Sequence, residues 1–148
     1  MISRTSGILL MSYILIFLGG LGYLLTPSPT VGETAETAET VVWGMFYVAG
    51  GAISALAAGI RPFMLRRITS LWYFEISGIS LIISANLVYA YSLYHTSLSS
   101  GVISQVALSA VLLAFSLALI ARSVEILSLI RYLSQYATNT ENLEASNG

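Results

Sequence analysis

The charged side chains of this chain are few, and they gather near the ends of long apolar stretches. Glu75 stands close to the start of one such stretch, and Arg122 follows another with Glu125 three residues later, a spacing at which helical side chains can pair. Opposite charges at a similar depth predict a cluster that fixes the helix ends at the edge of a bilayer. The predicted members of this charge cluster are Arg61, Arg66, Arg67, Glu75, Arg122 and Glu125.

Uncharged polar side chains mark the interiors of the third and fourth apolar stretches. Asn86 follows Glu75 by eleven residues, which is close to three helical turns, so both share a helix face with Ile79 and Ile82. The fourth stretch places its polar residues on one stripe by the same arithmetic: Gln105, Ser109, Ser116 and Ser123. These positions can line a water-filled path, or they can hydrogen-bond between helices. We favour the second interpretation, because membrane helices tolerate serine easily.

Enzymatic chemistry finds little support in the residue types. His95 is the single histidine and the chain has no cysteine, so histidine and cysteine cannot build a metal site here. No serine stands in a nucleophile motif, and no glycine run has phosphate-loop spacing. We therefore expect no catalytic residue, no cofactor and no metal ion. A net charge of −1 gives no reason to expect a nucleic-acid partner.

The composition predicts that the chain folds in a lipid bilayer and not in water. Of the 148 residues, 56% are hydrophobic and 9% are charged, whereas a soluble domain carries about 25% charged residues. Four apolar stretches, at about 7–25, 41–60, 72–94 and 102–121, are as helices long enough to cross a hydrocarbon core of about 30 Å. Because lipid offers no hydrogen bonds, each backbone must pair within its own helix. The sequence predicts an all-α, integral membrane four-helix bundle over residues 1–136.

The positions of the basic residues predict how the four spans are oriented. All six arginines lie before the first span, between the second and third, or after the fourth, while the loop at 33–40 carries acidic residues instead. The positive-inside rule then places both termini in the cytoplasm. A cleaved signal peptide is the less favoured interpretation of the first stretch, because that run is longer than the apolar core of such a peptide.

Small residues form two adjacent rows on the second span. Residues four apart share a helix face, and small side chains let a neighbouring backbone approach closely. These positions predict helix packing, either between copies of the chain or, as we favour, against other spans of the same chain. The rows consist of Gly51, Ala55 and Gly59, and of Gly50, Ser54 and Ala58.

The segment after the fourth span keeps a helical pattern. Residues 122–136 place Ile126, Ile130 and Leu133 on one side and Arg131 and Gln135 on the other, which predicts a short amphipathic cytoplasmic extension. Residues 137–148 are polar and acidic, and we expect them to form a disordered tail.

The order of these features resembles a group of small four-span membrane proteins encoded by phages of actinobacteria, often described as holins. The similar part runs from Trp43 through Gly50 and Gly51 to the basic turn with Arg61, and continues through 72–94 and a fourth helix. The acidic repeat at 33–40 and the acidic tail depart from that pattern. The resemblance implies a role in host cell lysis, in which copies cluster in the bacterial cytoplasmic membrane and open lesions.

Two functional hypotheses therefore stand beside each other. The first is a holin-type protein that forms homo-oligomers in the lipid bilayer and permeabilises it. The second is a non-enzymatic accessory, assembly or immunity protein that binds another membrane protein through its small-residue face or its amphipathic extension. A small transporter is less favoured, because no charged residue stands at the middle of a span, where ion-coupled transport normally needs one.

Overall fold

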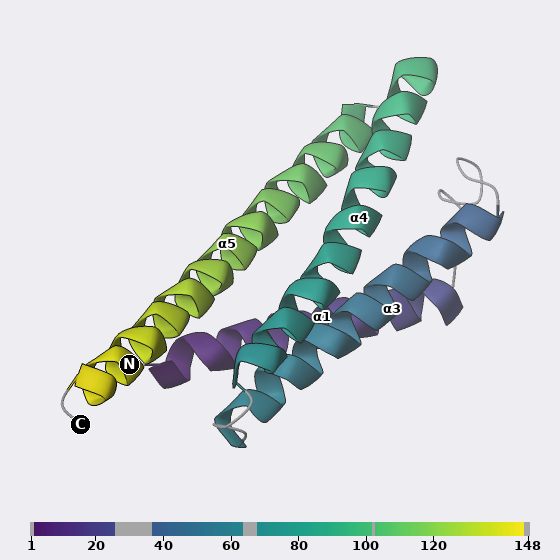
Figure 1. The fold of residues 1–148 in the computed structure, drawn as a ribbon. Coiled ribbons are helices and arrows are strands. Elements are labelled where there is room, and N and C mark those ends of the chain that lie inside the picture. Colours follow the sequence, from purple (N-terminus) through teal and green to yellow (C-terminus); the bar gives the residue numbers. More distant parts are fainter. Residues whose placement is uncertain (1, 26–36, 64–67, 102, 147–148) are drawn as a thin grey trace.

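The computed structural model describes residues 2–25, 37–63, 68–101 and 103–146, and these residues are almost entirely helical. Figure 1 shows the elements in order: α1 (Ile2–Leu25), α3 (Thr37–Ile60), the short 3-10 helix η1 (Arg61–Phe63), α4 (Ile68–Ser100) and α5 (Ile103–Ser146). Arg66 and Arg67 of the predicted charge cluster, and residues 33–36 of the acidic repeat, lie outside the described residues.

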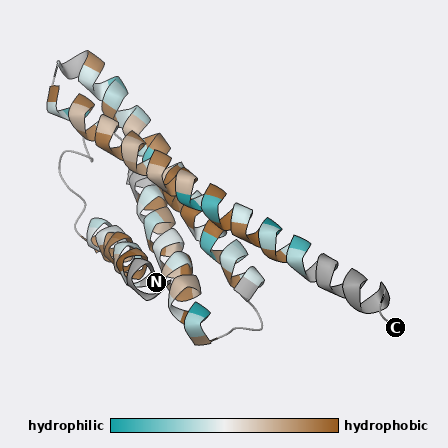
Figure 2. Cartoon of the chain, turned by 90° about the vertical axis from the view of Figure 1, so that its left-hand side faces the viewer, coloured by the Kyte–Doolittle hydropathy of each residue, from teal (hydrophilic) through white to brown (hydrophobic). Residues whose placement is uncertain are grey.

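Each long helix contains a stretch that is long and apolar enough to cross a membrane. These stretches are Gly7–Leu25, Val41–Phe63, Thr69–Leu98 and Ile103–Tyr136. The all-helical class and the four apolar helices predicted from the sequence are therefore confirmed. Figure 2 shows hydrophobic residues along all four helices, with hydrophilic residues more frequent in the half of α5 that leads to the C-terminus.

Consecutive helices pack against one another and run in opposite directions: α1 against α3, α3 against α4, and α4 against α5 (Figure 1). The first and last helices are not packed together in this way, so the bundle has three helix–helix interfaces, or seams. Its core contains Tyr13 of α1, Trp72, Ile79 and Ile82 of α4, and Ile126 of α5.

Glycines set how closely the helices of the first two seams approach. A Cβ atom added to Gly50 would lie 2.7 Å from the carbonyl oxygen of Gly78, and one added to Gly51 would lie 2.7 Å from the backbone nitrogen of Phe17. Real Cβ atoms do not come so close to backbone atoms. The two glycine positions therefore bring α3 into backbone contact with α4 on one side and with α1 on the other.

Helix α4 tolerates several serines because their hydroxyls bond to the helix itself. Ser77, Ser80 and Ser84 each donate a hydrogen bond of 2.9 Å to the carbonyl four residues earlier. All three residues are exposed, and a hydroxyl that is bonded in this way can face lipid without an unmet donor.

The turn between α4 and α5 is shorter than the sequence predicted. We expected the third span to end at 94 and the fourth to begin at 102, but α4 continues to Ser100 and is followed by Gly101, whose φ of 70° is left-handed. The backbone N–H of Gly101 donates to the carbonyl of Ser97 at 2.9 Å, as at a glycine C-cap. The prediction was wrong because His95 and the serines after it keep helical hydrogen bonding, and only glycine leaves it easily.

The last helix is longer than predicted. We expected a span over 102–121, a helical extension over 122–136 and a disordered tail over 137–148, whereas α5 is one helix of 44 residues that reaches Ser146. Residues 137–146 include alanine, leucine and glutamate, which are good helix formers, and they continue a helix that is already nucleated. Polarity alone therefore misplaced the end of the helix.

Candidate functional site

One buried face of α4 connects the polar groups that the sequence singled out. Glu75, Ile79, Ile82 and Asn86 lie along this face, and their exposed fractions are 0%, 0%, 0% and 1%. Their spacing predicted a shared face. The two isoleucines separate a charged region at Glu75 from an uncharged polar region at Asn86, about 16 Å further along the helix axis at 1.5 Å per residue.

The charged region is built around the carboxylate of Glu75. Arg61, from η1, forms an ion pair with Oε2 of Glu75. Arg122, from α5, donates from Nε and from Nη2 to Oε1, both at 3.4 Å. The hydroxyl of Tyr13, from α1, donates to the same oxygen at 3.0 Å. Four segments that are far apart in the sequence thus meet at one carboxylate.

Glu125 completes the charge balance of this region. Its carboxylate accepts a hydrogen bond of 2.6 Å from Nη1 of Arg122, and its side chain is 60% exposed, whereas that of Glu75 is not exposed at all. Two arginines and two glutamates therefore form a network without net charge that runs from a buried end to an exposed end. A buried charge is strongly destabilising when it lacks a partner, and this arrangement provides partners for Glu75 on both sides.

The uncharged polar region is formed by Asn86 and Tyr47. The hydroxyl of Tyr47, on α3, donates to Oδ1 of Asn86 at 2.5 Å. The amide nitrogen of Asn86 is buried and has no hydrogen-bond partner among the described residues. The two regions on α4 therefore differ: the carboxylate of Glu75 has an ion pair with Arg61 and accepts hydrogen bonds from Tyr13 and Arg122, while the amide nitrogen of Asn86 has no partner among the described residues.

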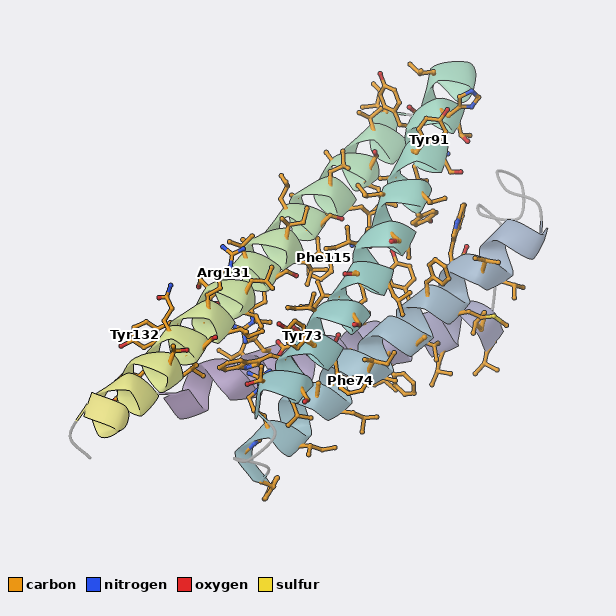
Figure 3. The ribbon with its side chains drawn as sticks, viewed as in Figure 1. Tyr73, Phe74, Tyr91, Phe115, Arg131 and Tyr132 are labelled. Carbon is orange, nitrogen blue, oxygen red and sulfur yellow. The ribbon has the colours of Figure 1, made fainter. Side chains whose placement is uncertain are left out.

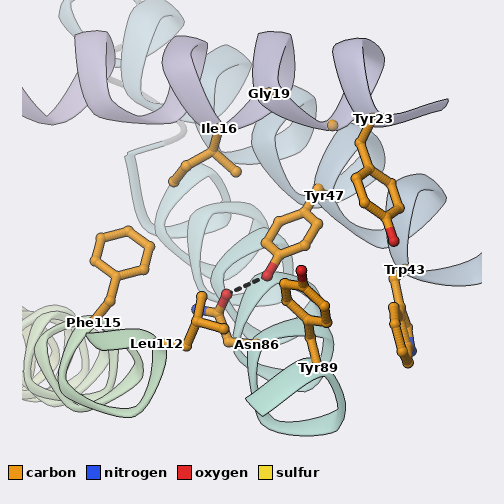
Figure 4. Close-up of a pocket in the computed structure, with 10 residues that line it drawn as sticks. Ile16, Gly19, Tyr23, Trp43, Tyr47, Asn86, Tyr89, Leu112 and Phe115 are labelled. Atoms are coloured by element: carbon orange, nitrogen blue, oxygen red, sulfur yellow. Dashed lines mark hydrogen bonds between the residues drawn. The ribbon is translucent and has the colours of Figure 1, made fainter. Parts of the chain in front are cut away.

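A cavity of about 320 Å³ lies beside Asn86. All four long helices contribute to its wall, and Figure 4 shows Tyr47, Tyr89 and Asn86 converging on it from α3 and α4. The indole of Trp43 packs against the ring of Tyr89 with the centroids 5.3 Å apart, which holds one side of the wall. The remaining wall is aliphatic or aromatic, so the cavity is largely apolar.

The polar stripe predicted on the fourth span is mostly used within the chain. Ser109 donates to the carbonyl of Ala90 on α4 at 2.9 Å, which is an interhelical bond. Ser116 and Ser123 donate to carbonyls of their own helix. Gln105 is partly buried, and its side-chain oxygen has no partner among the described residues. One of these three bonds, from Ser109, therefore joins two helices, and the other two stay within α5.

The small-residue rows of α3 are covered by other helices of the same chain. Gly50 and Ser54 both lie against Gly78 of α4, and Gly51 lies against Phe17 of α1. Ser54 is fully buried and donates a bond of 3.4 Å to the backbone carbonyl of Glu75. The remaining members also lie within the bundle: Ala55 and Ala58 pack in or against the core, and Gly59 lies near Leu10. In this fold, the rows serve packing within one copy.

Sequence reasoning found part of this constellation. The structure brings Arg61, Glu75, Arg122 and Glu125 together, as their charges predicted. Reasoning from the sequence missed Tyr13 and Tyr47, whose hydroxyls donate hydrogen bonds to Glu75 and Asn86. A signal was present, since a tyrosine inside an apolar span usually has a partner for its hydroxyl when it is buried. The partner itself depends on how helices pack, which spacing along one helix does not reveal.

No protein family, curated protein or solved structure matches this chain. Among the described residues, no group of three or more histidine, cysteine, aspartate or glutamate side chains could hold a metal ion.

Proposed function

We propose that this chain is a holin-type protein, which associates with copies of itself in a bacterial cytoplasmic membrane and permeabilises that membrane without catalysing a reaction. The proposal includes four crossings with both termini in the cytoplasm, in agreement with the segregation of the six arginines. The observation that carries it is the large apolar surface that α5 leaves uncovered.

The apolar part of α5 is too long for one bilayer. Its stretch Ile103–Tyr136 has 34 residues, which as a helix spans about 51 Å, while the hydrocarbon core is about 30 Å thick. Even a tilted helix of this length extends beyond the hydrocarbon. The Arg122–Glu125 pair then lies near the cytoplasmic edge, and the residues after it lie in the headgroup region or in water.

That end of α5 is covered on one side alone. Ile126 packs in the core, but Tyr132 is 65% exposed and Leu127 and Leu133 are also exposed. Figure 3 shows Tyr132 and Arg131 projecting from α5 away from the other helices. Apolar side chains that lie outside the hydrocarbon gain from being covered, and the same surface on a second copy supplies an amphipathic helix to do so.

A lesion needs more than this contact. Ser109 is bonded to the carbonyl of Ala90 on α4, and Ser116 is 2% exposed, so they cannot line a water path until α5 separates from α4. The seam between these helices has no backbone contact through glycine like the one between Gly50 and Gly78. We propose that association of α5 with a second copy competes with its packing on α4.

The test is induced expression in a bacterium, with membrane potential and dye entry as the measurements. The wild-type chain should collapse the potential and admit dye. Replacing the exposed apolar residues together, Leu127→Asn with Tyr132→Asn, should delay or prevent both. The control is Ser134→Asn, at an exposed polar position of the same helix, and it should behave like the wild type.

Membrane-inserted wild-type protein that leaves the potential intact would contradict the proposal. The second hypothesis, an accessory or immunity protein, uses the same surface with a different occupant. It gains support if purification in mild detergent recovers a stoichiometric foreign membrane protein that the double variant loses.

A further inference from the structure

We propose that the cavity beside Asn86 is a binding site for a neutral membrane-soluble molecule with an apolar body and one hydrogen-bond-accepting oxygen. The site lies three helical turns from the charge cluster and on a different part of the molecule from the uncovered surface of α5. The inference therefore does not depend on whether copies of the chain associate.

The first argument is the position of the cavity opening. Gly19 on α1 is exposed, and Phe115 on α5 is 38% exposed, and both residues line the cavity. Because the packed pairs are α1 with α3, α3 with α4 and α4 with α5, the helices α1 and α5 are the two ends of this series, and we place the opening between them. Figure 4 shows α1 and α5 on opposite sides of the cavity, with α3 and α4 behind it. In a bilayer this opening faces lipid, so a ligand enters from the membrane.

The second argument is the chemistry of the wall. None of the lining residues carries a charge. A charged group would lose its hydration here without gaining a partner, so the bound part of the ligand is neutral. A volume of about 320 Å³ lies at the lower end of the range for small-molecule pockets, about 300–1,000 Å³. The wall therefore fits a ring system or a short run of an alkyl chain.

The third argument is the amide of Asn86. Its oxygen accepts from Tyr47, which fixes the amide so that the nitrogen is the group with hydrogens to donate. The residue is 1% exposed, lines the cavity, and its nitrogen has no partner among the described residues. A donor left unmet in an apolar site is unfavourable, and a carbonyl, ester or ether oxygen of a ligand would satisfy it.

Two sources share this chemistry: the ester-linked acyl chain of a phospholipid, and a free neutral carbonyl compound dissolved in the membrane. Benzophenone is a suitable probe for the site, because it has two apolar rings, one carbonyl oxygen and a light-activated ketone that inserts into nearby C–H bonds. On irradiation the carbonyl carbon takes up the C–H carbon and its oxygen takes up the hydrogen, so the product is a tertiary alcohol joined to the protein.

The experiment is saturation labelling of the purified full chain in lipid nanodiscs, with adducts mapped by peptide mass spectrometry. We expect saturable labelling at cavity positions such as Leu112 and Phe115. Gly19→Phe should lower the apparent affinity roughly tenfold or more, because an added Cβ at Gly19 meets nothing within 4 Å and the ring can occupy the cavity. Asn86→Leu should lower it roughly two- to tenfold.

The matched control is Gly7→Phe, on the same helix. Gly7 is also exposed, and an added Cβ there meets nothing within 4 Å, but Gly7 does not line the cavity. It should label like the wild type. A thermal melt of Gly19→Phe, compared with that of Gly7→Phe, shows whether the variant is folded. If Gly19→Phe unfolds, Leu112→Trp, which fills the cavity from α5, takes the place of that variant in the labelling experiment.

Two competition arms distinguish the sources. Displacement by a neutral quinone at a fixed lipid content indicates a free membrane-soluble ligand, and displacement by added diacyl phospholipid in mixed micelles indicates an acyl chain. Either result supports the site. Labelling that does not saturate, or that is the same in Gly19→Phe, Gly7→Phe and the wild type, would overturn the proposal.

Discussion

The two polar regions on the buried face of α4 solve the same problem in different ways. At Glu75, a fully buried carboxylate is bonded by two arginines and a tyrosine from three other segments. At Asn86, a buried amide accepts a hydrogen bond from Tyr47, its nitrogen has no partner among the described residues, and a cavity lies beside it. The first region is filled and electrically balanced, which is what a structural centre needs. The second keeps space and an unmet donor, which is what a binding site needs.

The difference follows from what the neighbouring helices contribute. Around Glu75, α1, η1 and α5 supply long side chains that reach the carboxylate. Around Asn86, α1 supplies Gly19, where an added Cβ would meet nothing within 4 Å, while Gly20 lets α1 pack closely against Tyr47 and Val48 of α3. The lesson is that the same helix face can hold a closed site and an open one, depending on side-chain volume on the opposing helices.

The largest expected effect comes from removing the carboxylate of the filled region. Glu75→Ala leaves two partly buried arginines without their shared partner, and we expect a loss of about 3–5 kcal/mol in the free energy of unfolding. Titration with a denaturing detergent, followed by circular dichroism, measures it. The control is Glu125→Ala, which removes the exposed partner of Arg122 and should cost about 0–1 kcal/mol. Equal losses in the two variants would contradict the contrast between buried and exposed partners.

A second pair of variants compares packing in the filled and open regions directly. Ile79→Ala creates a void at a fully buried position, and we expect it to lower the free energy of unfolding by about 2–5 kcal/mol. The lower end applies because lipid already solvates apolar groups in the unfolded reference. Leu112→Ala enlarges a cavity that exists already, so its loss should be smaller than that of Ile79→Ala. A larger loss for Leu112→Ala than for Ile79→Ala would show that the cavity is not empty when the protein is in the membrane.

The glycine contact between the two regions gives the next effect. In Gly78→Ala the new Cβ would lie 2.7 Å from the carbonyl oxygen of Gly50, so α3 and α4 must move apart. Overpacking of this kind costs about 1–3 kcal/mol in the free energy of unfolding. Gly7→Ala is the control, because its Cβ meets nothing and alanine favours a helix. The same detergent titration applies, and a Gly78→Ala variant as stable as the wild type would refute close packing at this seam.

The smallest effect should come from the hydrogen bond in the open region. Tyr47→Phe removes the hydrogen bond that the Asn86 side chain accepts from Tyr47, and interhelical bonds in membranes contribute on average about 0.6 kcal/mol, with a maximum near 1.7. Tyr91→Phe, at an exposed position, should leave the unfolding free energy unchanged. If Tyr47→Phe cost as much as Glu75→Ala, the open region would be as structural as the filled one, and the proposed contrast would fail.

Much of this architecture could be predicted because it depends on local composition. A run of apolar residues must hydrogen-bond its own backbone in lipid, so length and the lack of charge were enough to locate four helices. The charge cluster followed from opposite charges at similar depth, and Arg61, Glu75 and Arg122 do meet.

Other features could not be predicted, because they depend on how the helices are placed relative to one another. The bonds from Tyr13 to Glu75 and from Tyr47 to Asn86 join residues 62 and 39 positions apart. The cavity lies where residues of α1, α3, α4 and α5 meet, and no pattern within one helix identifies that place. The end of α4 depended on the left-handed conformation of Gly101. The sequence does not indicate which of its glycines adopts that conformation.

The most direct test of the account is the sidedness of the two ends of the helices. The chain has no cysteine, so single cysteines can be introduced at two exposed positions, His95→Cys near the end of α4 and Ser134→Cys in α5. A membrane-impermeant maleimide is then added to intact cells and to permeabilised cells. Four crossings with both termini inside predict that His95→Cys reacts in intact cells and that Ser134→Cys reacts only after permeabilisation. Reaction of both cysteines from the same side would contradict a membrane crossing by α5, and with it the proposed orientation of the charge cluster and the cavity.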